Sequence, residues 1–262
     1  MPTVTARDGV ALHVEARGDG PLVVIAHGLW APPTVFAGLC DELATDHRVL
    51  TYDARGTGRS DRNGPFDLAT DAADLAEIVA DQGLPATLVG AGAGSSVSLH
   101  VLAERPDLVT AVVCPSGSPV NRVVGRGTDS LAGSRSVFQL LSEQAQRDYR
   151  GFLRSIVTST NPQLHDAGVG ERVAQVVDYI PHAVMLERLR AWLGDDAVAI
   201  SRSAGDRLTI LLHGDDAWSS VEAIDATREL LPEAQVLEVE DGPLSRPDIT
   251  AEVVRRVSGV AA

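Results

Sequence analysis

The sequence predicts an α/β protein with a mostly parallel sheet, helices on both faces of that sheet and a helical insertion. Short, continuous apolar segments alternate with segments of helical periodicity, which is typical of βαβ units. This alternation stops between residues 120 and 206, where helical patterns occur without strands, and it then resumes. A length of 262 residues, 44% of them hydrophobic, suits a single core with a modest insertion. We therefore expect a core of residues 1–119 and 207–262 and a cap of residues 120–206.

The first half of the chain contains the signals for a hairpin and four further strands. Residues 3–16 alternate around Asp8 and Gly9, which predicts an edge hairpin with a tight turn. Four β-rich segments follow, and their continuous apolar residues indicate strands covered on both faces. They are PLVVIAHG, HRVLTYDA, PATLVGAG and VTAVVCPSG, starting at Pro21, His47, Pro85 and Val109.

Apolar residues at helical spacing lie between these strands and in the insertion. The positions are Val35, Leu39 and Leu43 for one helix and Leu68, Ala72, Leu75 and Val79 for the next. In the insertion, helices are expected over Arg172 to Ile180 and His182 to Leu193. The sheet then resumes with RLTILLHGDD from Arg207 and EAQVLEVED from Glu233, separated by a helix with a capping box from Ser219 to Glu222. Ile249, Val253 and Val257 predict a last helix.

Composition excludes several classes of function. A formal net charge of -14 and scattered arginines argue against a nucleic-acid partner. The absence of lysine excludes Schiff-base chemistry. Cys40 and Cys114 lie far apart in apolar contexts, so we expect two buried thiols, with no disulfide, metal site or cofactor. No apolar run approaches the ~20 residues that span a bilayer, and no signal segment is evident, so the expected location is cytoplasmic and the expected partner a small molecule. The oligomeric state stays open.

Three motifs resemble the α/β-hydrolase superfamily, and the likeness covers nearly the whole chain outside the insertion. HGLW from His27 resembles the family's His-Gly segment after its third strand, and YDARGTGRS from Tyr52 resembles its Asp-x-Arg-Gly-x-Gly-x-Ser turn. LVGAGAGSSVSLHVLAERPDLV from Leu88 resembles the nucleophile elbow and its helix without gaps. The resemblance places Gly92 where the family has its catalytic serine.

The resemblance also implies that the other two triad residues are missing. The acid position, three residues after the glycine of the His213-Gly214 turn, is Ala217. The loop expected to carry the histidine, EDGPLSRPD, contains none, and Leu244 or Pro243 takes its place. We therefore expect a degenerate triad, because a change confined to one position would not explain all three.

The backbone part of the hydrolase site does not depend on those side chains. The resemblance implies that the N–H groups of Leu29 and Ala93 form an oxyanion hole, which the N-terminus of the helix after Gly92 would support. Glycine takes the strained elbow conformation at almost no cost. An equally weighted alternative is that Gly90, Gly92 and Gly94 simply let strand and helix approach closely.

Five side chains are candidates for contact with a ligand. His27 either reaches the ligand or braces its loop by hydrogen bonding, and the second interpretation is favoured. Trp30 and Trp218 follow the oxyanion loop and the vacated acid position, where they would line an aromatic-tolerant pocket or pack in the core. Asp216 lies beside the acid position, and Leu244 lies at the histidine position.

The hypothesis from these residues is a non-hydrolytic, cofactor-independent enzyme for a small, mostly apolar carbonyl compound. Lyase, cyclase, isomerase and condensation reactions all fit, and a place in secondary metabolism follows only from the habits of the superfamily. Two alternatives remain. One is a catalytically inactive ligand-binding or partner protein, and the other is a hydrolase with a relocated nucleophile, for which Ser95 and Ser96 are poor candidates because hydroxyls inside helices usually bond to the preceding turn.

Overall fold

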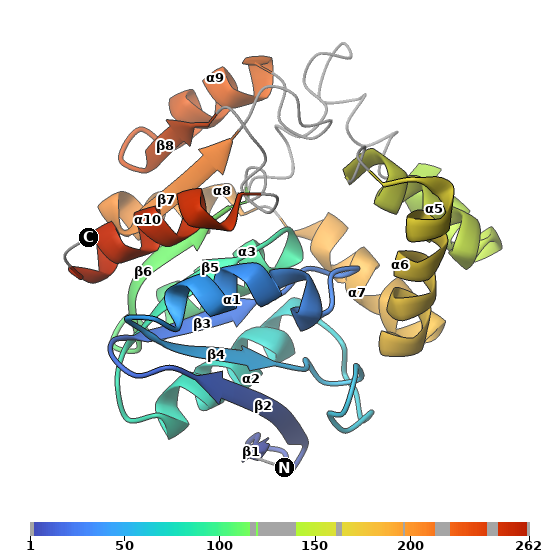
Figure 1. Cartoon of the computed structure of the whole chain (residues 1–262), viewed down its shortest axis with the longest axis horizontal. Coiled ribbons are helices and arrows are strands. Elements are labelled where there is room, and N and C mark those ends of the chain that lie inside the picture. The colour runs from blue at the N-terminus through green and yellow to red at the C-terminus, as the bar shows by residue number, and fades with distance from the viewer. Residues whose placement is uncertain are drawn as a thin grey trace.

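An eight-stranded, mostly parallel sheet forms the centre of the molecule (Figure 1). The structure is a computed structural model that describes residues 3–115, 119, 140–160, 164–195, 197–212, 221–239 and 246–260. The strand order is β1-β2-β4-β3-β5-β6-β7-β8, with only β1 and β2 antiparallel to their neighbours. The strands are β1 Thr3–Thr5, β2 Ala11–Arg17, β3 Leu22–Ala26, β4 Arg48–Tyr52, β5 Ala86–Gly90, β6 Val109–Cys114, β7 Leu208–Leu212 and β8 Gln235–Glu238. The predicted fold class is confirmed.

Successive side chains of the central strands point to opposite faces of the sheet, and each face has its own hydrophobic core. Both sets of side chains are therefore apolar, which explains the continuous apolar sequences. In β3, Val24 packs into the core under α2, α3, α8 and α9, whereas Val23 and Ile25 pack under α1 and α10. Both faces of the sheet are therefore covered, as the sequence predicted. The helices are α1 Ala37–Leu43, α2 Leu68–Asp81, α3 Ala93–Glu104, α8 Val198–Ala204, α9 Val221–Leu230 and α10 Pro247–Ser258, with short 3-10 turns at Pro33–Phe36 and Gly205–Arg207.

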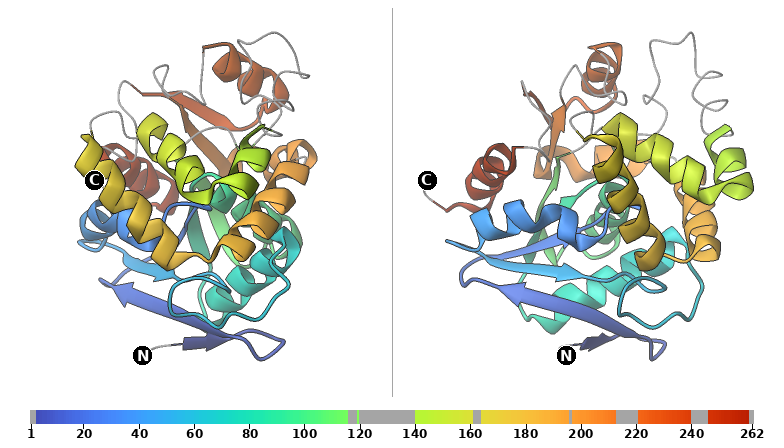
Figure 2. Two further views of the ribbon diagram at one scale, coloured as in Figure 1. Left: turned by 90° about the vertical axis from the view of Figure 1, so that its right-hand side faces the viewer. Right: turned by 45° about the vertical axis from the view of Figure 1, so that its right-hand side comes forward.

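Helices of the insertion cover one end of the sheet (Figure 2). They are α5 Tyr149–Thr160, α6 Asp166–Tyr179 and α7 His182–Gly194, and residues 140–147 are helical as well. Their apolar faces form a separate core, which Leu29 joins from the loop after β3 and Ala93 joins from the first turn of α3. This second core brings the insertion onto the part of the sheet where the predicted site lies. The domain boundaries at residues 119 and 206 stay a prediction.

Several smaller predictions can also be compared with the structure. The hairpin of β1 and β2 pairs Val4 with Leu12, and Gly9 takes a positive φ of 88° in its turn. Cys40 and Cys114 are buried free thiols, as expected. The predicted capping box begins at Ser219, which lies outside the described residues. Within the described part of the chain, no helix combines the length and hydrophobicity needed to cross a membrane.

Candidate functional site

The turn between β5 and α3 has the backbone of a nucleophile elbow, with Gly92 at its apex. Gly92 adopts φ 54° and ψ −121°, a conformation that is strained for any residue with a side chain. Around it, the N–H of Ala91 donates to Ala26 O at 3.1 Å and the N–H of Gly94 donates to Ala91 O at 2.9 Å. The turn is thus tied to the end of β3 as well as to its own strand and helix.

The glycines of this turn are needed for different reasons. A Cβ on Gly94 would lie 2.0 Å from Ala26 O, and a Cβ on Gly90 would lie 2.6 Å from Gly94 O, so both positions require close backbone approach. A Cβ on Gly92 would meet no atom within 4 Å. The close-approach interpretation therefore explains Gly90 and Gly94, whereas at Gly92 the backbone conformation alone favours glycine. The position presents no side-chain nucleophile, and open space lies where one would project.

Two backbone donors beside this turn have no acceptor in the described part of the chain. Leu29 and Ala93 are both buried and line the same small cavity. Neither N–H donates to any described residue. Ala93 is the first residue of α3, so the positive end of the helix dipole lies beside its N–H. This arrangement gives the site two hydrogen-bond donors in a buried setting, which is the arrangement that stabilises a negatively charged oxygen.

His27 braces the wall of the cavity through both ring nitrogens. Its Nδ1 donates to Gly28 O at 2.9 Å, and its Nε2 accepts from the Ala54 N–H at 3.4 Å and from the Tyr179 hydroxyl at 3.1 Å. Burial lowers the pKa of His27 to about 4, so the ring is neutral near pH 7. The geometry agrees with the bracing interpretation that the sequence favoured, although the ring also lines the cavity.

Trp30 packs between the insertion and the core. Its ring meets Phe152 and Trp192 edge-on, with centroid distances of 6.1 and 6.0 Å. It is not among the described residues that line the cavity. The remaining predicted site residues, Trp218, Asp216, Ala217 and Leu244, lie outside the described residues, so the erased acid and histidine positions stay predictions.

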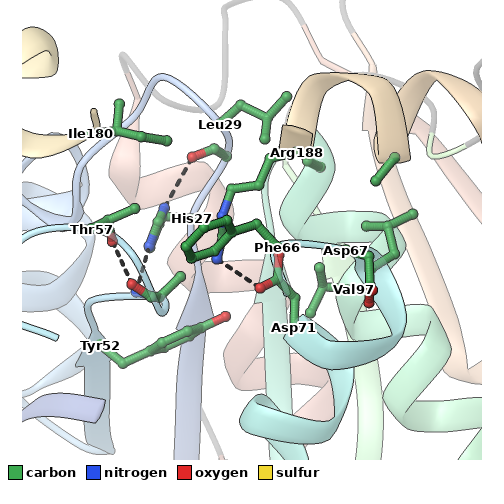
Figure 3. A pocket seen from close by; sticks show the side chains of 15 residues that line it. His27, Leu29, Tyr52, Thr57, Phe66, Asp67, Asp71, Val97, Ile180 and Arg188 are labelled. Carbon is green, nitrogen blue, oxygen red and sulfur yellow. Dashed lines mark hydrogen bonds and ion pairs between the residues drawn. The ribbon is translucent and has the colours of Figure 1, made fainter. Parts of the chain in front are cut away.

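The structure adds a buried ion pair that the sequence analysis missed (Figure 3). Arg188 of α7 donates through Nη2 to Asp71 Oδ1 of α2 at 2.7 Å and to Arg55 O at 2.8 Å. Burial raises the pKa of Asp71 to about 6, and the charge of Arg188 opposes this shift. Both residues lie on the apolar stripe of their helix. Asp71 lies between Leu68 and Leu75 in α2, and Arg188 lies between Met185 and Leu189 in α7. A charge inside an apolar stripe was therefore the signal that could have identified this pair.

The cavity itself is small and partly apolar. Its volume is about 20 Å³, and the groups just described line it together with Tyr52, Thr57, Phe66, Val97 and Ile180. A space of this size accommodates one water-sized group. A larger hollow of about 210 Å³ is lined by Tyr179, Pro32, Asp53 and Arg59 among others. No group of metal-ligating side chains occurs in the described part of the chain.

Comparison with known proteins identifies the family. A sequence model described as the alpha/beta hydrolase family matches residues 23–253. A putative carbamate hydrolase RutD of Caulobacter vibrioides is 25% identical over 258 residues, covering 90% of this chain and 89% of that protein. A pimeloyl-[acyl-carrier protein] methyl ester esterase of Chromobacterium violaceum is 38% identical over 108 residues, which is 41% of each chain.

Solved structures support the same fold. An esterase from Exiguobacterium antarcticum superposes with a TM-score of 0.81 at 20% identity, covering 98% of both chains. A bromoperoxidase from Bacillus anthracis gives a TM-score of 0.81 at 18% identity, covering 98% of this chain and 99% of that chain. At such identities these structures establish the architecture and not the reaction. Together with the matched family model and the geometry of the elbow, they show that this chain belongs to the alpha/beta hydrolase family.

Proposed function

We propose that this protein is a non-hydrolytic, cofactor-independent enzyme that stabilises an oxyanion formed from a small carbonyl compound. The observation that supports the proposal is the pair of unpaired N–H groups of Leu29 and Ala93 beside a turn that carries no nucleophile. Such donors act on the charge that develops on a carbonyl oxygen and need no triad. Many named relatives are hydrolases or esterases. The proposal differs from their named activities, because it assigns this chain a reaction that needs no serine nucleophile.

The chemistry that this arrangement supports is formation of an enolate or alkoxide. When a solvent water molecule takes an α-proton from the carbonyl compound, the C–H electron pair forms a carbon–carbon double bond and the carbonyl electrons move onto oxygen. The two N–H groups would bind that oxygen more strongly than the neutral carbonyl, which lowers the barrier. Isomerisation, cyclisation, condensation and lyase reactions all proceed through such a species. Acyl transfer to the chain at position 92 is excluded because Gly92 has no hydroxyl.

A hydrolase with its nucleophile at Ser95 or Ser96 receives no support from the geometry. The Ser95 hydroxyl donates to Gly90 O at 2.6 Å, as expected for a hydroxyl inside a helix. The Ser96 hydroxyl differs from that expectation, because it is buried in α3 without a hydrogen-bond partner among the described residues. Neither residue is among those that line the cavity. Fluorophosphonate probes, which label activated serines, should leave the protein unmodified in intact-protein mass spectrometry. Stoichiometric labelling of either serine would overturn the non-hydrolytic proposal.

The proposal is tested by removing one N–H with Ala93→Pro. Proline suits the first residue of a helix, and here no hydrogen bond to a described residue is lost. The residue before a proline must be extended. Gly92, at φ 54° and ψ −121°, has the mirror image of that conformation, which only glycine takes freely. The variant should therefore fold, as circular dichroism would check.

The assay is exchange of α-protons for deuterium in D2O, followed by proton NMR on pyruvate, acetoacetate, levulinate and their amides. Ala93→Pro should slow the protein-catalysed exchange by about 10² to 10³, the scale for one lost oxyanion donor. Ala93→Gly, which keeps the N–H, is the matched control and should stay within a few-fold of the unmodified rate. Equal exchange rates in Ala93→Pro and Ala93→Gly would refute the oxyanion mechanism. Binding without exchange in the unmodified protein would favour the inactive ligand-binding alternative.

A further inference from the structure

Arg188 has a buried donor that no described residue satisfies. Its side chain is 7% exposed, and it lines the cavity beside the elbow. Both contacts of the guanidinium that the structure gives, to Asp71 and to Arg55 O, use Nη2. Nε is buried without a hydrogen-bond partner. A donor of a charged group that is left unpaired away from water is costly, so its retention calls for an acceptor that is bound there at some stage of function.

The surroundings of Nε indicate what kind of acceptor fits. Beside the two amides, the lining combines apolar side chains with polar ones, among them the carboxylates of Asp67 and Asp71. Arg188 is the one cation among the described residues that line the cavity. Nη2 is already shared between two acceptors, which leaves Nε to bind a single oxygen rather than both oxygens of a carboxylate. The cavity admits one water-sized group, so a ligand that reaches both the two amides and Nε must displace side chains that line it.

Charge favours an anionic oxygen over a neutral one. Hydrogen bonds from a guanidinium to an anion are shorter and stronger than those to neutral acceptors. Asp71 is the existing counter-ion of Arg188, but burial raises the pKa of Asp71 to about 6. The groups that act on Asp71 are Arg188 and Arg55, which favour its ionised form, and Asp74 and Asp67, which oppose it. Because Asp71 is easily protonated, a second anion can share Arg188 at a modest cost.

We propose that the site takes an oxo acid, whose carbonyl oxygen is bound by the Leu29 and Ala93 amides and whose carboxylate accepts a hydrogen bond from Nε of Arg188. This inference rests on the proposed function, because it assigns the second anchoring point of the same ligand. It replaces the mostly apolar compound expected from the sequence with an acidic one. Arg188 is then a specificity-determining residue supplied by the insertion, on the helix that packs over the site.

The test compares acids with their neutral amides on the unmodified protein. Pyruvate, acetoacetate and levulinate are titrated against pyruvamide, acetoacetamide and levulinamide, which keep the size and remove the charge. Binding is followed by tryptophan fluorescence, since Trp192 lies on α7 one turn after Arg188. At least one acid should bind about 10- to 100-fold more tightly than its amide, the range for a charge-assisted hydrogen bond. If no acid is preferred over its amide, the inference is overturned.

Variants then assign the preference to Arg188. Arg188→Gln should bind acid and amide equally, whereas Arg190→Gln, a matched loss of charge at an exposed position of the same helix, should retain the preference. Since Arg188→Gln leaves Asp71 without its counter-ion, Arg188→Gln combined with Asp71→Asn provides a second variant with a neutral pair. Retention of the preference in the folded single or double variant would overturn the inference.

The same panel separates this inference from the proposed function. A preference for acids without α-proton exchange leaves the subsite standing and removes the enzymatic proposal. Exchange that is equally fast for acids and amides leaves the oxyanion mechanism standing and removes the role of Arg188. Binding preference and α-proton exchange therefore test the two proposals independently.

Discussion

Substitution of Gly92 by alanine measures the strain that the elbow imposes on an ordinary residue. At φ 54° and ψ −121°, a residue with a Cβ is strained by about 1–3 kcal/mol. The new methyl group adds no clash, because a Cβ there meets nothing within 4 Å. Alanine also reduces the conformational entropy of the unfolded chain, which offsets about 0.4–1 kcal/mol. The free energy of unfolding should therefore fall by about 1–2 kcal/mol.

The measurement is thermal and urea-induced unfolding of Gly92→Ala beside Gly170→Ala. Gly170 lies inside α6, has no positive φ and also has open space at its Cβ. The control should be more stable than the unmodified protein by about 0.5–1 kcal/mol, because alanine is the better helix former. A loss of 1–2 kcal/mol corresponds to a Tm lower by roughly 2–8 °C in a chain of this size. A Gly92→Ala protein that is as stable as its parent would refute the strained elbow.

Three further predictions follow from the same region. Gly92→Ser should not hydrolyse nitrophenyl esters, because His27, the described histidine at the cavity, has both nitrogens engaged; rapid ester turnover would reveal another base nearby. Gly94→Ala should destabilise the fold more than Gly92→Ala, because its Cβ would lie 2.0 Å from Ala26 O; equal unfolding temperatures for the two variants would contradict this. Asp71 has a folded pKa of about 6, above its ordinary 3.8, so its ionised form costs stability that is regained as pH falls through about 6. The unmodified protein should thus gain stability relative to Asp71→Asn between about pH 7 and pH 4 in urea titrations, and parallel pH profiles would refute this shift.

The fold could be predicted from local patterns because each pattern has one physical interpretation. Continuous apolar runs at β3 to β6 indicate strands buried on both faces, and the described strands begin within about a residue of those runs. The elbow was predicted from the resemblance of its sequence to the α/β-hydrolase motif, and the structure adds that Gly90, Gly92 and Gly94 each meet a constraint of the backbone.

The site could be predicted only where its chemistry lies in the backbone. The proposed role of Leu29 and Ala93 depends on N–H groups whose place follows from the chain path, so a motif was sufficient to name them. Asp71 and Arg188 meet only because α7 packs over α2, and no pattern within either helix specifies that contact. Each apolar stripe contains a charged residue, which indicates a buried ion pair, but the sequence does not show which two residues pair.

The hydrogen bonds of His27 connect the position of the insertion to the position of the Leu29 amide, one of the two proposed oxyanion donors. The ring holds the carbonyl of Gly28, the residue directly before Leu29, while its other nitrogen receives the hydroxyl of Tyr179 at the end of α6. The backbone of Tyr179 is fixed in turn, since its carbonyl accepts the N–H of Gly58 at 2.9 Å. A displacement of α6 would therefore be transmitted through the imidazole ring to the loop that carries the Leu29 amide, so the position of the insertion and the position of this proposed donor are coupled.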